Sequence, residues 1–136
     1  MSTIHIGPYI NFQGRAREAM EFYHHLLGGT LVLNAVNKQG ISQPAGPGDR
    51  IAHAQLDADG VHIFASDGHP DYPAAIGEHM AIALGGTDKD RLTTIFNDLA
   101  EGGKTKMPLI KQPSGAEVGW LTDKFGINWM VTIEKA

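Results

Sequence analysis

The feature that most constrains this sequence is an internal repeat with a period of about 70 residues. The segment DADGVHIFAS at residues 57–66 matches the segment DKFGINWMVT at residues 123–132, and the hydrophobic alternation after the glycine of each segment is in register. In a second match, earlier in each half, His5 aligns with His79. A repeat of this length predicts two copies of one supersecondary unit, each too small to bury a large core alone.

The composition indicates one small folded domain and excludes several functional classes. The chain has 136 residues, of which 42% are hydrophobic and 19% are charged, so it can bury a core. A formal net charge of −4 and the lack of a basic run argue against a nucleic-acid partner. Without cysteine there is neither a disulfide nor a thiolate ligand. We see no apolar stretch that could span a membrane and no signal peptide, so we expect a cytoplasmic protein.

Hydrophobic periodicity divides the first copy into strands around one helix. Residues 14–27 have apolar side chains at helical spacing, and Gly28-Gly29 can end that helix because glycine adopts left-handed backbone conformations. Pro8 predicts that the first strand is an edge strand or that the Pro8 nitrogen faces outward, since proline cannot donate a ladder hydrogen bond. The polar segment 37–50, rich in Gly and Pro, predicts a mobile loop. The last two of four expected strands form a hairpin, and the four cover residues 4–12, 31–36, 51–56 and 61–66.

The second copy repeats this order of elements. Residues 88–100 form an amphipathic helix, with Thr87 or Asp88 as its N-cap and Gly102-Gly103 after its end. The expected strands cover residues 79–84, 104–111, 117–122 and 127–133. The sequence therefore predicts a single domain with a first module at residues 1–67, a linker at residues 68–78 and a second module at residues 79–136.

Two tandem βαβββ modules predict an α+β protein with an open cleft. A sheet with one helix buries only one of its faces, so the two modules can align their sheets and curl into one mixed sheet. The helices then cover the outside, and the concave face forms the cleft. Clefts of this kind are the default binding sites for small molecules.

Four segments carry a family resemblance: PYINFQGRAREAMEFYHHLLGG (8–29), HAQL (53–56), EGGKTKMPL (101–109) and TDKFGINWMV (122–131). They resemble the vicinal oxygen chelate superfamily, which includes glyoxalase I, bleomycin resistance proteins and extradiol dioxygenases. The resemblance is closest to its PhnB-like branch and spans almost the whole chain. It implies the glyoxalase/bleomycin resistance fold and a homodimer. The branch is also described as demethylubiquinone methyltransferase-like, but this sequence has no strand–GxGxxG–helix to hold an adenosyl cofactor.

The resemblance also implies where a metal ion would bind. Metal-dependent members of the superfamily hold one divalent ion, such as Zn, Ni, Fe or Mn, with ligands from the first and last strands of each module. His79 takes the place of a histidine ligand in the second module, and His5 or Gly7 takes the matching place in the first. Phe64 and Met130 stand where the family has glutamates. The resemblance therefore implies an incomplete metal site, with His79 and His5 as its remaining ligands.

Other histidines could supplement this pair. If His5, His53, His62 and His79 converged on the concave face, three of their imidazoles could hold a metal or supply a general base. The simpler alternative is that each one is an ordinary sheet or surface histidine.

The candidate ligand-binding residues are those that strand parity can place in the cleft. Phe64 and Met130 would make its floor apolar, which favours an organic ligand over a hydrated ion. Trp120 and Trp129 either pack in the core or cleft wall, or one of them stacks on a flat ligand. The full candidate set is Tyr9, Asn11, His53, Gln55, His62, Phe64, Ser66, Trp120 and Met130.

Two acidic residues at matching positions of the repeat have a simpler explanation. Asp57 and Asp123 each begin a turn, where a carboxylate that caps backbone amides explains them fully. We therefore expect neither residue to contact a ligand.

Two functions from different classes fit these residues. In the first, the protein binds a small organic molecule in the cleft and is a metal-assisted lyase, isomerase or dioxygenase with a degenerate metal site. In the second, a metal-free homodimer binds and sequesters such a molecule without catalysis. A purely structural role has no residue that specifically favours it. In both functions the partners are a small molecule and a second copy of the chain, with neither nucleic acid nor membrane.

Overall fold

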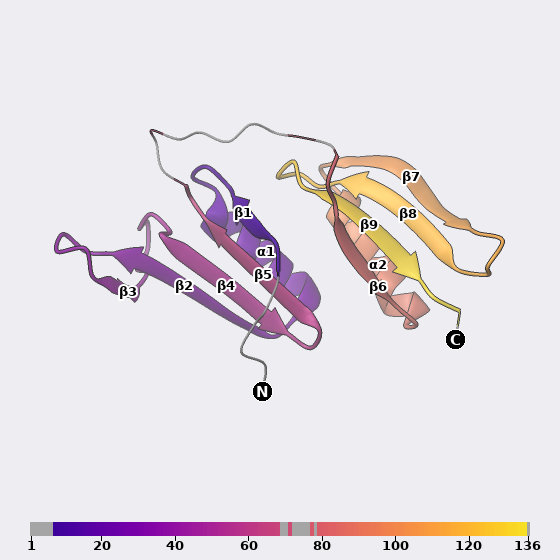
Figure 1. Cartoon of the computed structure of the whole chain (residues 1–136), viewed down its shortest axis with the longest axis horizontal. Coiled ribbons are helices and arrows are strands. Elements are labelled where there is room, and N and C mark those ends of the chain that lie inside the picture. The colour runs from indigo at the N-terminus through magenta and orange to yellow at the C-terminus, as the bar shows by residue number, and fades with distance from the viewer. Residues whose placement is uncertain (1–6, 69–70, 72–76, 78, 136) are drawn as a thin grey trace. The chain divides into compact units, whose positions relative to one another are not determined.

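The computed structural model describes residues 7–68, 71, 77 and 79–135. These residues form two compact units that divide near residue 75. Figure 1 shows the first unit in indigo to magenta and the second in salmon to yellow. Most of the predicted linker, and the predicted metal ligand His5, lie outside the described residues.

The first unit is a five-stranded sheet with one helix. Its sheet has the order β1-β5-β4-β2-β3, in which β1 runs parallel to β5 and the other neighbours are antiparallel (Figure 1). Strand β1 is an edge strand, one of the two alternatives that Pro8 predicted, and the Pro8 carbonyl still accepts a hydrogen bond from Phe64 N at 2.9 Å. The elements are β1 (Tyr9–Asn11), α1 (Ala16–Leu27), β2 (Thr30–Val36), β3 (Ser42–Pro44), β4 (His53–Ala58) and β5 (Val61–Ser66).

The second unit repeats this topology with one strand fewer. Its sheet has the order β6-β9-β8-β7, and its edge strand β6 again runs parallel to the last strand, β9 (Figure 1). The elements are β6 (Ile82–Gly86), α2 (Lys89–Ala100), β7 (Lys104–Lys111), β8 (Glu117–Thr122) and β9 (Asn128–Ile133). The predicted βαβββ order is therefore confirmed in the second unit, and the first unit adds β3 to it.

The helix in each unit packs one apolar face against its sheet. In α1 the buried positions recur at helical spacing, and they include Met20 and Tyr23, which have no exposed surface. They face β4 and β5, where Leu56 and Ile63 are buried opposite each other. In the part of the chain that the structure describes, neither helix is long and apolar enough to cross a membrane.

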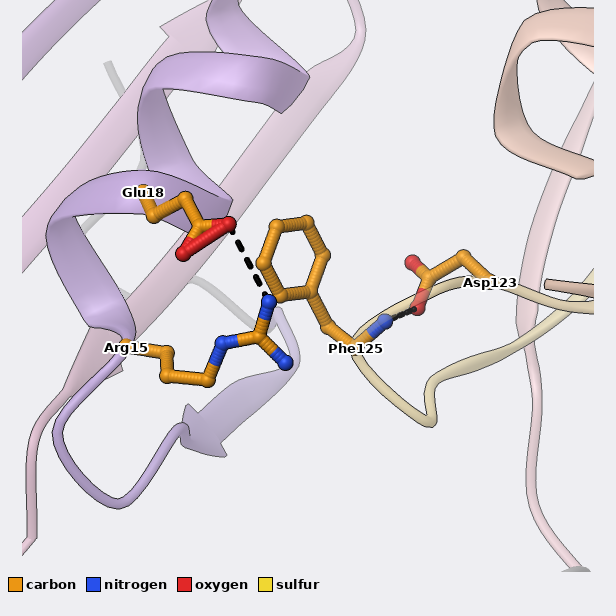
Figure 2. Close-up of polar contacts among 4 residues, drawn as sticks. All are labelled: Arg15, Glu18, Asp123 and Phe125. Carbon is orange, nitrogen blue, oxygen red and sulfur yellow. Dashed lines mark hydrogen bonds and ion pairs between the residues drawn. The ribbon is translucent and has the colours of Figure 1, made fainter. Parts of the chain in front are cut away.

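A buried carboxylate holds the start of α1. Asp67 accepts from Ala16 N at 2.8 Å and from Ile51 N at 2.7 Å, so it ties the first turn of the helix to the chain before β4. A negative charge at a helix N-terminus is also favourable to the helix dipole. Figure 2 shows a second contact here, the 3.1 Å ion pair of Arg15 and Glu18. Both of its side chains are at least half exposed, so we expect it to contribute little.

Helix α2 begins at a side-chain cap. Asp88 is the N-cap, and its carboxylate accepts from Arg91 N at 3.2 Å. Sequence reasoning left Thr87 and Asp88 open as the cap, and the structure selects Asp88. We therefore expect Asp88→Ala to lower the free energy of unfolding by about 1 kcal/mol in urea denaturation, because it removes the partner of a helix-end amide. Thr87→Ala is the matched control and should change it far less. Equal losses in the two variants would contradict the assignment.

Several predicted segments differ in the structure, and two of them change the description of the fold. The segment 37–50 was predicted as a loop, but it contains the short strand β3, which pairs with the end of β2, and Asn37 Oδ1 accepts from Gln39 N and Ile41 N. Gly and Pro mark turns, and here the turns flank a short edge strand. The strand predicted over 79–84 begins instead at Ile82, so the prediction was wrong for its first residues.

Candidate functional site

Each unit leaves one face of its sheet without a helix. In β4 and β5, Leu56 and Ile63 point toward α1, and successive residues of a strand point to opposite faces. Cross-strand partners in a sheet share a face, so the register identifies the members of the other side. We call this side of the first sheet the first helix-free face, and it carries Tyr9, Asn11, His53, Gln55, Asp57, His62, Phe64 and Ser66.

The first helix-free face brings together seven of the nine candidate ligand-binding residues. Tyr9 and Gln55 are both in register with Phe64, and Asn11 is in register with Ser66. The rings of His53 and Phe64 are stacked, with centroids 6.4 Å apart. The face therefore combines aromatic surface with polar side chains, although the role of each residue in binding stays a prediction.

Asp57, which the sequence analysis left out of the candidate ligand-binding residues, contacts two polar side chains of the first helix-free face. Asp57 is in register with His62, and Nδ1 of His62 donates to its Oδ1 at 2.9 Å. Nε2 of Gln55 donates to the other oxygen of Asp57 at 2.7 Å. The expectation that a turn cap fully explains Asp57 is therefore wrong. Strand β4 continues to Ala58, so Asp57 lies within the strand and its side chain follows the pleat.

The matching acidic residue of the second unit behaves as predicted. Asp123 is buried, and its Oδ1 accepts from Phe125 N at 2.8 Å, which Figure 2 shows, and from Ile127 N at 3.0 Å. Its Oδ2 accepts from Nε1 of Trp129 at 2.9 Å. Asp123 therefore holds a turn and a core indole in place. Trp129 is only 1% exposed, so of the two tryptophans it is the packing residue.

The second helix-free face lies on the sheet of the second unit, opposite α2, and it is mostly apolar. Trp120 and Met130 face each other across β8 and β9, and Met107 is in register with Trp120 on the other side. Val118 and Ile110 continue this surface. Trp120 is 38% exposed, so its indole is available to a ligand. The remaining two candidate residues, Trp120 and Met130, thus share one face.

The positions where the superfamily has glutamate ligands carry no oxygen ligand in this sequence. Phe64 and Met130 are on the helix-free faces, at the positions where glutamates would stand, and neither side chain has an oxygen. His79 is exposed and precedes β6 instead of opening it. Among the described residues no three His, Asp or Glu side chains are grouped so that they could hold an ion. Whether a metal binds stays a prediction, as does the single cleft expected between the modules.

A family model now identifies the chain. The model described as 3-demethylubiquinone-9 3-methyltransferase matches residues 4–132. The chain belongs to this family. It is 27% identical over 141 residues to protein YjdN of Escherichia coli K12, covering 96% of this chain and 95% of that protein.

Solved structures agree with this assignment. PA1353 from Pseudomonas aeruginosa is 39% identical, with a TM-score of 0.84 over 98% of this chain and 100% of that chain. The PhnB protein of Bacillus cereus is 26% identical, with a TM-score of 0.75 over 96% of this chain and 100% of that chain. The predicted PhnB-like branch is therefore confirmed.

Two more distant neighbours confirm the fold class. A glyoxalase-related enzyme from Fulvimarina pelagi has a TM-score of 0.61 at 16% identity, over 96% of this chain and 88% of that chain. A glyoxalase/bleomycin resistance protein/dioxygenase from Alicyclobacillus acidocaldarius has a TM-score of 0.53 at 15% identity, over 97% of this chain and 90% of that chain. The α+β glyoxalase/bleomycin resistance fold is thus shown.

Proposed function

We propose that this protein binds a small organic molecule on its helix-free sheet faces and does so without a metal ion. One observation carries the proposal: seven side chains from β1, β4 and β5 share a face on which Asp57 fixes Gln55 and His62 beside the Phe64 ring. A few oriented polar groups next to aromatic surface are typical of small-molecule sites. The apolar surface around Trp120 supports the same function.

A thermal-shift screen tests this proposal. A ligand that binds only the folded state raises its stability, so at a hundredfold excess over its Kd it should add about 2.7 kcal/mol. We expect hits among flat aromatic compounds such as naphthols, quinones and flavones. If no compound of these classes raises the melting temperature, the proposed function is contradicted.

Tryptophan fluorescence then reports whether a hit reaches the second helix-free face. Trp120 is partly exposed on that face and Trp129 is buried under α2, so only the first should respond directly to a ligand. A compound that binds there should change the emission of the wild type. It should change the emission of Trp120→Phe much less, because that variant retains only Trp129. A hit that changes both proteins equally would place its binding away from Trp120.

Catalysis with a metal is the second candidate, and two imidazoles on one face, His53 and His62, favour it. Plasma mass spectrometry of the purified protein, before and after incubation with Zn, Ni, Fe or Mn, separates the two candidates. The metal-free proposal predicts a stoichiometry near zero and ligand affinities that a chelator leaves unchanged. One ion per chain, or affinities that fall on chelation, would favour the metal-assisted function.

Assembly and location complete the proposal. The superfamily resemblance favours a homodimer, which light scattering during size-exclusion chromatography should report as twice the chain mass. The negative formal charge of −4 is consistent with the absence of a nucleic-acid partner. We propose that the protein acts in the cytoplasm.

A further inference from the structure

We infer that the first helix-free face recognises a planar ligand with an acidic hydroxyl, of the phenol or enol class, and that His62 accepts the hydrogen bond from that hydroxyl. This inference rests on the proposed function and names the class of its ligand. The residues that carry it are His62, Asp57, Gln55 and Phe64.

The hydrogen bonds determine which nitrogen of His62 can accept. A carboxylate only accepts hydrogen bonds, so Nδ1 of His62, at 2.9 Å from Oδ1 of Asp57, carries the proton in the neutral ring. Nε2 then has a free lone pair and becomes an acceptor. The described residues make no hydrogen bond to Nε2, and the side chain of His62 is 54% exposed. A ligand that donates a hydrogen bond, such as a hydroxyl, fits this nitrogen.

A second contact to Asp57, from the side-chain amide of Gln55, fixes the orientation of the carboxylate that holds His62. Nε2 of Gln55 donates to Oδ2 of Asp57 at 2.7 Å, so both carboxylate oxygens have partners and the carboxylate cannot rotate freely. An imidazole held in one tautomer and orientation is the usual form of a histidine that must accept a proton or hydrogen bond at a set position. The other titratable side chains on this face are His53 and Tyr9.

The aromatic surface next to His62 indicates a flat ligand. Phe64 follows His62 by two residues on the same face, so their side chains start roughly 7 Å apart, about the length of one aromatic ring. The His53 ring lies beside Phe64, with centroids 6.4 Å apart, so the two rings together form an aromatic surface. A ligand ring over Phe64 would carry its hydroxyl toward Nε2 of His62.

The duplicated fold provides an internal comparison. Asp123 matches Asp57 in the sequence repeat, yet it lies in the turn after β8, is buried, and accepts from the backbone of that turn and from the Trp129 indole. In strand register, the pair of the second unit that corresponds to Asp57 and His62 is Thr122 and Asn128, and Trp120 takes the place of Gln55. The paired histidine and carboxylate therefore occur in one unit only. A feature that the fold required would be expected in both units, whereas a feature that serves a ligand need occur only once.

Isothermal titration calorimetry with two matched probes tests the inference. 2-Naphthol and 2-methoxynaphthalene have nearly the same shape, but only the first can donate a hydrogen bond. We expect the wild type to bind 2-naphthol roughly fivefold to tenfold more tightly than its methyl ether, the value of one hydrogen bond. His62→Leu should bind both probes equally.

Two further variants keep the test independent of folding. Asp57→Asn preserves the shape of the site but no longer fixes the tautomer of His62, so it should lose most of the preference. His25→Gln is the control, because His25 is an exposed residue of α1 on the opposite side of the sheet, and it should keep the full preference. Circular dichroism establishes that each variant is folded before titration.

The outcomes separate the inference from the proposed function. Equal affinity of the wild type for the two probes, or a preference that survives in His62→Leu, overturns the inference and leaves the proposed function standing. The same holds if neither probe binds while other compounds of the thermal-shift screen do. If no compound binds, both proposals fail.

Discussion

Replacing Gly29 by alanine should destabilise the protein by about 3 kcal/mol or more, because the new methyl group has no room. Gly29 has φ +85°, and a Cβ at this position would collide with the carbonyl oxygen of Asp57 and with Ala58. The obstacle is backbone of β4, so it cannot move aside like the end of a flexible side chain. Urea denaturation followed by circular dichroism measures the loss.

The adjacent glycine is the matched control. Gly28 also has a positive φ, +75°, but a Cβ there meets no atom within 4 Å. Gly28→Ala should therefore suffer only the strain of its backbone conformation, φ +75° and ψ −158°, which costs a residue with a side chain about 1–3 kcal/mol. In the second unit Gly103→Ala should behave like Gly29→Ala, because its Cβ would collide with the carbonyl oxygen of Thr122. Equal stabilities of Gly28→Ala and Gly29→Ala would contradict the close approach of Gly29, after the end of α1, to the backbone of β4.

Asp123→Ala should be the second severe variant, with a loss of about 3–5 kcal/mol. The carboxylate is 3% exposed and accepts from Phe125 N, Ile127 N and the Trp129 indole. Its removal leaves the buried indole and the two part-buried amides without that acceptor, and a buried donor that loses its partner costs about 1–3 kcal/mol. The fluorescence of Trp129 during urea denaturation should report the loss, since its indole contacts the carboxylate directly.

The repeat supplies the control for this prediction. Asp57 occupies the matching position, but its side chain is 43% exposed and its partner His62 is 54% exposed. Water can replace the lost partner, so Asp57→Ala should lower stability by less than about 1 kcal/mol. Equal losses in Asp57→Ala and Asp123→Ala would contradict the view that one copy uses its aspartate for the fold and the other for a ligand.

Most of the fold could be predicted because it depends on patterns that extend over many residues. The repeat, the helical spacing of apolar residues and the alternation within hairpins each recur in both halves, so a local error does not remove the signal. The segment 117–122 was predicted with the bounds that β8 has. The sequence also predicted that His53 and Gln55 share one face of their strand and that His62 and Phe64 share one face of theirs, because successive strand residues alternate between faces. Their common face depends on the register of β4 with β5, which the sequence left open.

The errors concern features that depend on only one or two residues. β4 begins and ends two residues later than the predicted 51–56, and this shift places Asp57 in the strand instead of in a turn. The repeat concealed the change, because Asp123 does begin a turn and the two aspartates were treated alike. The positions of Gln55 and His62 could have distinguished Asp57 from Asp123. Gln55 precedes Asp57 by two residues on the same face of β4, and His62 is its cross-strand partner on β5.

The position of His79 could not be settled from sequence for a related reason. The repeat aligned it with His5, but the start of an edge strand is set by hydrogen bonds to its neighbour. The pairing of β6 with β9 begins at Ile82 and Trp129. The place of His79 in the fold therefore depends on where the pairing of β6 begins, and an alignment with His5 does not determine that.

Nuclear magnetic resonance of the histidine rings tests the central claim most directly. The claim is that a small molecule binds on the first helix-free face, where His53 and His62 lie, whereas His24 and His25 lie on α1 behind the sheet. Titration with 2-naphthol, or with the best compound of the thermal-shift screen, should shift the ring signals of His53 and His62 and leave those of His24 and His25 in place. Shifts confined to the α1 histidines, or no shift at any ring under saturating ligand, would contradict it.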